Sequence, residues 1–124
     1  MIRSVLVLAA AGAIACAPPG PRGGSRDTNL ITQEELLASQ ASYAYDAIRH
    51  LRPMFLRSRG QNTFDPRVPT TPEVFVDGQK YGHIETLKTM PVPQIVAIRF
   101  LNASEATTKY GTGYTAGVIE VTTR

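Results

Sequence analysis

The sequence predicts a small α+β domain, built on a mixed sheet of three to four strands with two to four short helices. The clearest sign is a glycine-punctuated turn at 110–117 that leads directly into a β-branched strand. An alternating apolar run at 96–101 offers that strand a partner, and a shorter run at 74–76 ends in the turn residues Asp77 and Gly78. With 124 residues, of which 43% are hydrophobic, the chain has room for one domain and one modest core.

The first 28 residues are predicted to lie outside this domain. Residues 1–15 have the pattern of a signal peptide, because a positive start precedes an apolar run that is shorter than the roughly 20 residues of a membrane span. Small residues directly precede Cys16, the only cysteine, and this resembles a bacterial lipoprotein signal. The resemblance implies that the Cys16 sulfur carries a lipid anchor, followed by a Pro- and Gly-rich tether over 16–28 and the folded domain over 29–124. An ordinary signal peptide cut elsewhere is the alternative.

The domain is expected to open with a short strand and a helix. Residues 29–31, in which Leu30 and Ile31 are apolar, form the possible short strand. Thr32 and Glu35 then have the spacing of a capping box, in which the hydroxyl accepts from one amide and the carboxylate reaches back to the other. Leu36 and Leu37 are predicted to form the buried side of this helix.

A second helix is predicted over residues 42–52. Arg49 and Arg52 fall away from the centre of its apolar face, and Pro53, which lacks an amide donor, should end it. The residues at three-and-four spacing that should face the core are Ala44, Ala47, Ile48 and Leu51.

The second half of the chain is predicted to hold most of the sheet. A long connection at 58–72 leads to the strand at 74–76, and a short helical stretch follows at 84–89. Another helical turn or two is expected at 104–109, before the final strand. In the strand at 96–101, alternation predicts one face made of Val96, Ile98 and Phe100.

Two charged residues interrupt the predicted strands. Arg99 lies in the run at 96–101, and Glu120 lies in the closing strand. If the two strands are neighbours, these side chains are expected to pair across the exposed face of the sheet, an interaction of under about 1 kcal/mol.

The order of these elements resembles the plug domain of TonB-dependent outer-membrane receptors. In that family a helix precedes a strand that ends in Asp-Gly, a Pro-containing segment leads to an apolar strand, and Tyr-Gly with further glycines turns into a closing strand. The likeness covers most of residues 43–124 and implies a plug-like α+β fold. It is carried by the stretches 44–53, 74–78, 90–101 and 106–123.

A complete receptor of this family also surrounds its plug with a barrel. Such barrels use about 22 strands of about 9–11 residues each, on the order of 200 residues in strands alone. That is more than the 124 residues here. The resemblance therefore implies a plug-like domain without a barrel of its own, working alone on a membrane surface or beside a barrel encoded elsewhere.

Nothing in the sequence points strongly to catalysis or to a cofactor. Gly111, Gly113 and Gly117 lead into a strand, whereas the glycines of a dinucleotide loop follow a strand and open a helix. We expect these glycines, like Asp77 and Gly78, to be turn residues. No nucleophile motif is present, and neither histidine has partners at a metal-ligand spacing. We therefore predict no catalytic residue, no cofactor and no metal.

One enzymatic alternative stays open. An envelope enzyme could use His83 with Asp77 or Glu85, provided that these three side chains converge in a cleft. A purely structural lipoprotein is a third possibility.

The densest basic run is the candidate surface for a partner. It contains Arg49, Arg52, Arg57 and Arg59, next to the loop at 58–72. The formal net charge of only +3 does not call for nucleic acid as a partner. The leading expectation is a lipid-anchored binding or interaction module at the outer membrane, facing either side, with an accessory role beside an uptake receptor as one form of it.

Overall fold

The computed structural model describes residues 26–58 and 65–124. The predicted signal peptide, the lipidation site Cys16, most of the tether and Arg59 lie outside the described residues.

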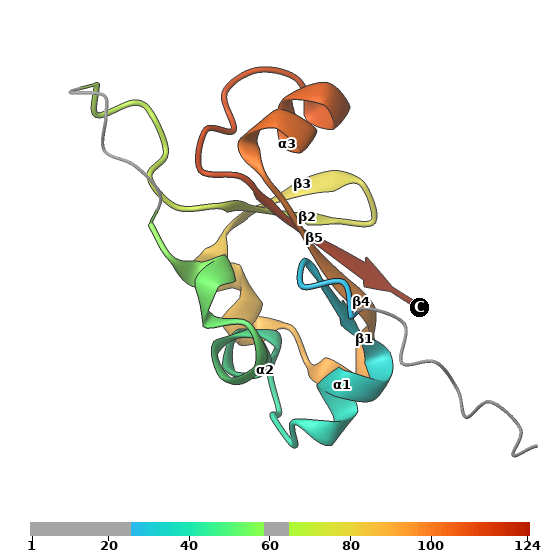
Figure 1. Cartoon of the computed structure of the whole chain (residues 1–124). Coiled ribbons are helices and arrows are strands. Elements are labelled where there is room, and N and C mark those ends of the chain that lie inside the picture. Colours follow the sequence, from blue (N-terminus) through green and yellow to red (C-terminus); the bar gives the residue numbers. More distant parts are fainter. Residues whose placement is uncertain (1–25, 59–64) are drawn as a thin grey trace, which may run out of the picture.

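A five-stranded mixed sheet forms the centre of the domain (Figure 1). Its order is β1-β4-β5-β2-β3, and every neighbouring pair is antiparallel except β2 and β5, which are parallel. The α+β class and the mixed sheet predicted from the sequence are confirmed, with five strands where three to four were expected. The strands are β1 (Leu30–Thr32), β2 (Glu73–Val76), β3 (Gln79–His83), β4 (Ile95–Leu101) and β5 (Val118–Thr123).

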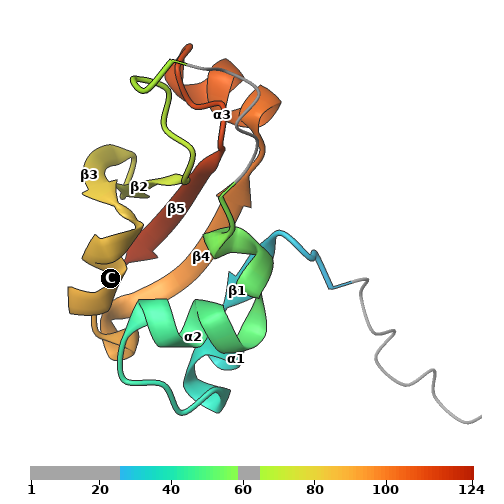
Figure 2. The ribbon, with the colours of Figure 1, turned by 90° about the vertical axis from the view of Figure 1, so that its left-hand side faces the viewer.

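Short helices connect the strands. The three α-helices are α1 (Gln33–Ala38), α2 (Ala44–Leu51) and α3 (Ala103–Tyr110). Three 3-10 helices complete the described part of the chain: η1 (Pro53–Leu56), η2 (Ile84–Thr89) and η3 (Val92–Gln94). Figure 2 shows α1 and α2 side by side near one end of the sheet and α3 at the opposite end of β4.

The two early helices begin and end where their local chemistry requires. At α1, the Glu35 amide donates to the Thr32 hydroxyl at 3.4 Å and the Thr32 amide donates to the Glu35 carboxylate at 3.3 Å, so the predicted capping box is present. Helix α2 stops at Leu51, two residues before Pro53, which opens η1. Leu36 is buried, but the prediction for Leu37 is wrong: that side chain is 53% exposed, because adjacent residues of a helix point about 100° apart.

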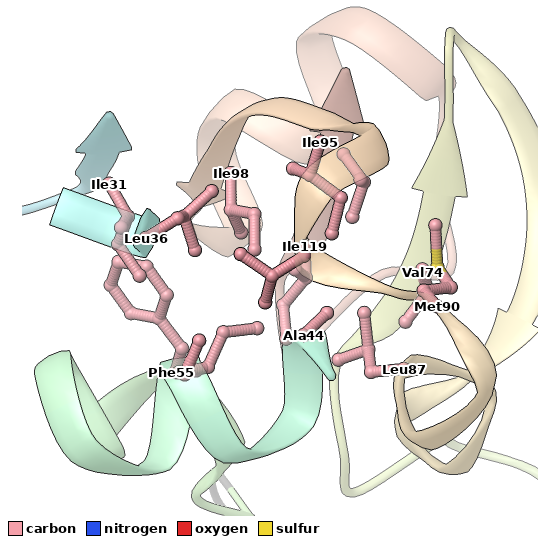
Figure 3. Packing of buried hydrophobic residues seen from close by; sticks show 14 of the residues in the cluster. Ile31, Leu36, Ala44, Phe55, Val74, Leu87, Met90, Ile95, Ile98 and Ile119 are labelled. Atoms are coloured by element: carbon pink, nitrogen blue, oxygen red, sulfur yellow. The ribbon is translucent and has the colours of Figure 1, made fainter. Parts of the chain in front are cut away.

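The main core lies between one face of the sheet and α1, α2, η1 and η2 (Figure 3). Phe55 from η1 stacks on Phe100 from β4, with ring centroids 5.2 Å apart. Ile98 and Ile119 contribute from the central strands and are completely buried. A second, smaller core lies on the opposite face of the sheet beneath α3 and contains Phe75, Leu101, Ala106 and Val118.

A bulge near the start of β4 changes the predicted alternation. Ile95 lies opposite Thr123, and the next paired residue, Ala97, lies opposite Thr122, so Val96 is left without a partner in the register. The prediction that Val96 shares a face with Ile98 and Phe100 is therefore wrong. Ile95 is fully buried in its place, and Val96 is 36% exposed.

Candidate functional site

The described residues cover only part of the sheet face that carries the smaller core. At the end where β4 passes into α3, a groove of about 360 Å³ separates the helix from the strands. Four charged side chains line it, two of each sign, with two hydroxyls and one leucine. We call this the charged groove; its residues are Arg99, Leu101, Ser104, Glu105, Thr108, Lys109 and Glu120.

Helix α3 forms one wall of the charged groove. Its first turn is held by a capping box, in which the Glu105 amide donates to the Asn102 side chain at 2.9 Å and the Asn102 amide donates to the Glu105 carboxylate at 3.1 Å. Only Ala106 of this helix is buried, so its polar side faces the groove and solvent. The helix ends at Tyr110 with Gly111 as its C-cap, and the chain returns to β5 through residues 112–117.

Aromatic side chains pack this returning segment onto the sheet. The Tyr110 ring stacks on Phe75 with centroids 4.0 Å apart, and Tyr114 meets Phe75 edge-on at 5.5 Å. The Lys80 ammonium lies 5.8 Å from the centroid of the Tyr114 ring and 2.7 Å from the Glu73 carboxylate, which is buried. We call residues 103–117, which carry α3 and this loop, the cap.

The carboxylate of Glu120 connects the cap to β5. The Tyr110 hydroxyl donates to its Oε1 at 2.8 Å, and the Lys109 ammonium ion-pairs with the same oxygen. Burial tends to raise the pKa of Glu120, but the hydrogen bonds from Lys109 and Tyr110 outweigh it and hold that pKa below its ordinary value. Burial and the Glu120 carboxylate together raise the pKa of Tyr110. Glu120 is therefore a charged acceptor at neutral pH, and both donors lie in the cap.

The expected pairing of Arg99 with Glu120 is half right. The two residues lie directly opposite each other in the register of β4 and β5. Their ion pairs in the described chain go elsewhere, however: the Arg99 guanidinium lies 3.5 Å from Asp27, and Glu120 takes Lys109. The reason is that α3 brings a lysine to the groove, which the alternation of the strands could not indicate.

All five residues assigned to turns have positive φ angles. Asp77 at +50° and Gly78 at +85° make the two-residue connection between β2 and β3. Gly111, Gly113 and Gly117 are at +95°, +112° and +89°. Gly117 is also sterically required, because a Cβ there would lie 2.6 Å from the carbonyl oxygen of Leu101.

The three residues of the enzymatic alternative are not brought together. Asp77 sits in the turn of the β2–β3 hairpin, whereas His83 lies opposite Glu73 at its other end, about 13 Å away along the strand. The Asp77 carboxylate accepts from the amide of Thr123 at 2.9 Å, and Glu85 ion-pairs with Lys88. Across residues 26–58 and 65–124, no group of three or more His, Cys, Asp or Glu side chains could hold a metal ion.

The predicted basic surface divides into two kinds of arginine. Arg52 is structural: its guanidinium donates to the carbonyl oxygens of Thr28 at 3.2 Å and Leu51 at 3.0 Å, and approaches Glu35 at 3.5 Å. Arg49 is exposed and lies 3.5 Å from Asp46, its neighbour on the helix. Arg57 is also exposed. These two remain available to a partner.

Sequence reasoning missed the polar face of α3. Ser104 and Thr108, like Glu105 and Lys109, are four residues apart and therefore share one side of a helix. That spacing was the available signal, but it indicates a groove only once α3 is known to lie against β4 and β5.

Two further observations bear on the setting of the site. Among the described residues, no helix has both the length and the apolar character needed to cross a membrane. In comparisons of the sequence with family models and with curated proteins, no match was found.

Proposed function

We propose that this protein is a lipid-anchored interaction module of the outer membrane, whose plug-like domain docks on another envelope protein. An accessory role beside an uptake receptor is the form that the resemblance to plug domains favours. Support for the anchor and its position comes from the sequence around Cys16 and the tether that follows it.

The observation that carries the docking role is the unequal covering of the sheet. Within residues 26–58 and 65–124, one face is buried under four helical segments, while the other is covered by the cap and carries the charged groove. A shallow groove with charges of both signs suits a polar contact with a protein surface, in which arginine is enriched. Arg99, whose side chain is 54% exposed, is the groove residue best placed to meet a partner.

The anchor is tested by a Cys16→Ser variant. Wild-type protein should enter the detergent phase on phase separation, and the variant should stay in the aqueous phase, because it lacks the acyl chains that supply membrane affinity. Equal partitioning of the two proteins would reject the lipid anchor and leave the docking role to be judged separately.

The docking role is tested by crosslinking in membranes. A photo-reactive amino acid at Thr108, on the groove wall, should crosslink an envelope protein that mass spectrometry can identify. The same photo-reactive amino acid at Leu37, which is exposed on α1, is the matched control and should not crosslink that protein. Arg99→Glu should weaken the crosslink from Thr108 more than Arg49→Glu does. A larger effect of Arg49→Glu would move the docking surface to α2, and the absence of any partner from either position would reject the proposed function.

A further inference from the structure

We infer that the cap, residues 103–117, opens and closes as a unit while the rest of the domain stays folded, and that Glu120 is the latch that holds it closed. This inference goes beyond the proposed function and holds whether or not a partner docks. Opening of the cap would also change the charged groove, because α3 forms one wall of that groove.

The first observation is that the domain has two separate cores. The main core joins the sheet to the helices of the other face, and no residue of the cap belongs to it. Only the smaller core lies under the cap, where Ala106 is the one fully buried contribution from α3. Ala116 is the other buried apolar residue of the cap, and Tyr110 and Tyr114 are partly buried. A segment held by these few apolar side chains can detach at a smaller free energy than global unfolding.

The second observation is the position of the cap in the chain. It enters from the end of β4 and leaves into β5, so both of its ends are fixed in the central strands (Figure 1). Gly111 and Gly113 lie within it and Gly117 closes it, and all three have positive φ. Displacing the cap would therefore leave the strand pairings of the sheet in place, apart from the bond at 3.4 Å that the Glu73 amide donates to the carbonyl oxygen of Gly117.

The third observation is that, in the part of the chain that the structure describes, two side-chain hydrogen bonds from the cap meet at one atom of β5. Oε1 of Glu120 receives both the Tyr110 hydroxyl at 2.8 Å and the Lys109 ammonium. The same tyrosine, Tyr110, also stacks on Phe75. Loss of the Glu120 charge should therefore loosen the helix and the aromatic contact together, and opening would expose Phe75, Leu101 and Val118.

The test is native-state hydrogen exchange on the full chain in detergent, followed by mass spectrometry. In the wild-type protein, amides of the cap should exchange faster than those of β4 and β5, and with a weaker dependence on denaturant, as expected for a local opening. Glu120→Gln should speed exchange in the cap by about tenfold, the difference between a hydrogen bond to a charged acceptor and one to a neutral acceptor, and leave α2 and β4 unchanged. Glu85→Gln, which removes an exposed carboxylate paired with Lys88, is the control and should leave the cap unchanged.

Two results would overturn the inference. One is exchange of the wild-type cap at the same rate and with the same denaturant dependence as β4 and β5, since the cap would then open only by global unfolding. The other is equal acceleration of every segment by Glu120→Gln, which would make Glu120 a support of the whole fold. Because the wild-type measurement needs no substitution, the first result is decisive even if the variant folds poorly.

Discussion

Replacing Gly117 with alanine should destabilise the domain strongly, for two separable reasons. The residue has φ of +89°, a backbone conformation that costs an alanine roughly 1–2 kcal/mol. The added Cβ would also lie 2.6 Å from the carbonyl oxygen of Leu101 and 2.7 Å from Cζ of Phe100, neither of which can move freely inside the sheet. Overpacking of this kind costs typically about 1–3 kcal/mol. The expected loss is therefore about 2–5 kcal/mol, a large part of the roughly 5–15 kcal/mol that stabilises a typical domain.

Gly113→Ala is the matched control for this prediction. Gly113 has φ of +112°, but nothing lies within 4 Å of the position that its Cβ would take. The Gly113→Ala variant should therefore lose only the roughly 1–2 kcal/mol of stability that its backbone conformation costs an alanine. Urea denaturation of both variants, with linear extrapolation to water, measures the difference. If Gly117→Ala loses no more stability than Gly113→Ala, the close contact with β4 does not constrain this turn and the reasoning is wrong.

Three further predictions concern the core, the sheet end and the basic helix. Phe55→Ala should lower the free energy of unfolding by about 3–5 kcal/mol, because the ring is completely buried; a loss under 1 kcal/mol on urea denaturation would contradict this. Hydrogen bonds from Thr123 hold the pKa of Asp77 below its ordinary value of 3.8. The Asp77 carboxylate therefore stabilises the folded state at neutral pH, and this stabilisation is lost as the pH falls below 3.8 through the pKa of the folded state. Asp77→Asn should accordingly flatten the acid limb of a stability–pH curve, and an unchanged limb would count against the contact. Arg52→Ala should cost about 1–2 kcal/mol on thermal denaturation and Arg49→Ala almost nothing, whereas equal losses would remove the distinction between them.

The class of the fold and the positions of most elements followed from the sequence, because local chemistry determines them. The capping residue Thr32 and the helix-ending Pro53 act within a few residues of themselves, and both have the predicted effect. The strand β3 was missed because Gln79–His83 is a polar edge strand with no alternating apolar pattern. Its pairing with β2 follows from the turn at Asp77 and Gly78, a signal that was available but was interpreted only as an end to β2.

The candidate site was much less predictable than the fold. The inward place of Ile95 and the outward place of Val96 depend on a bulge, and one extra residue in a strand reverses the face of everything before it. Likewise, the sequence predicts that Glu120 pairs with Arg99 on the neighbouring strand. It cannot show that α3 brings Lys109 back across the sheet to Glu120. Interactions of this kind arise from the packing of elements that are distant in sequence, and periodicity within one element carries no information about them.

The central place of β5 has a consequence for how the chain is made. This strand comes last among the described elements, yet it lies between β4 and β2 and is the only link between the two halves of the sheet. During synthesis β1 can pair with β4, and β2 with β3, but the two pieces have nothing to join them until residues 118–123 have emerged. Completion of the sheet is therefore expected to wait for these residues, with the apolar edges of both pieces uncovered in the interval. A chaperone that binds nascent chains would meet the protein in that state.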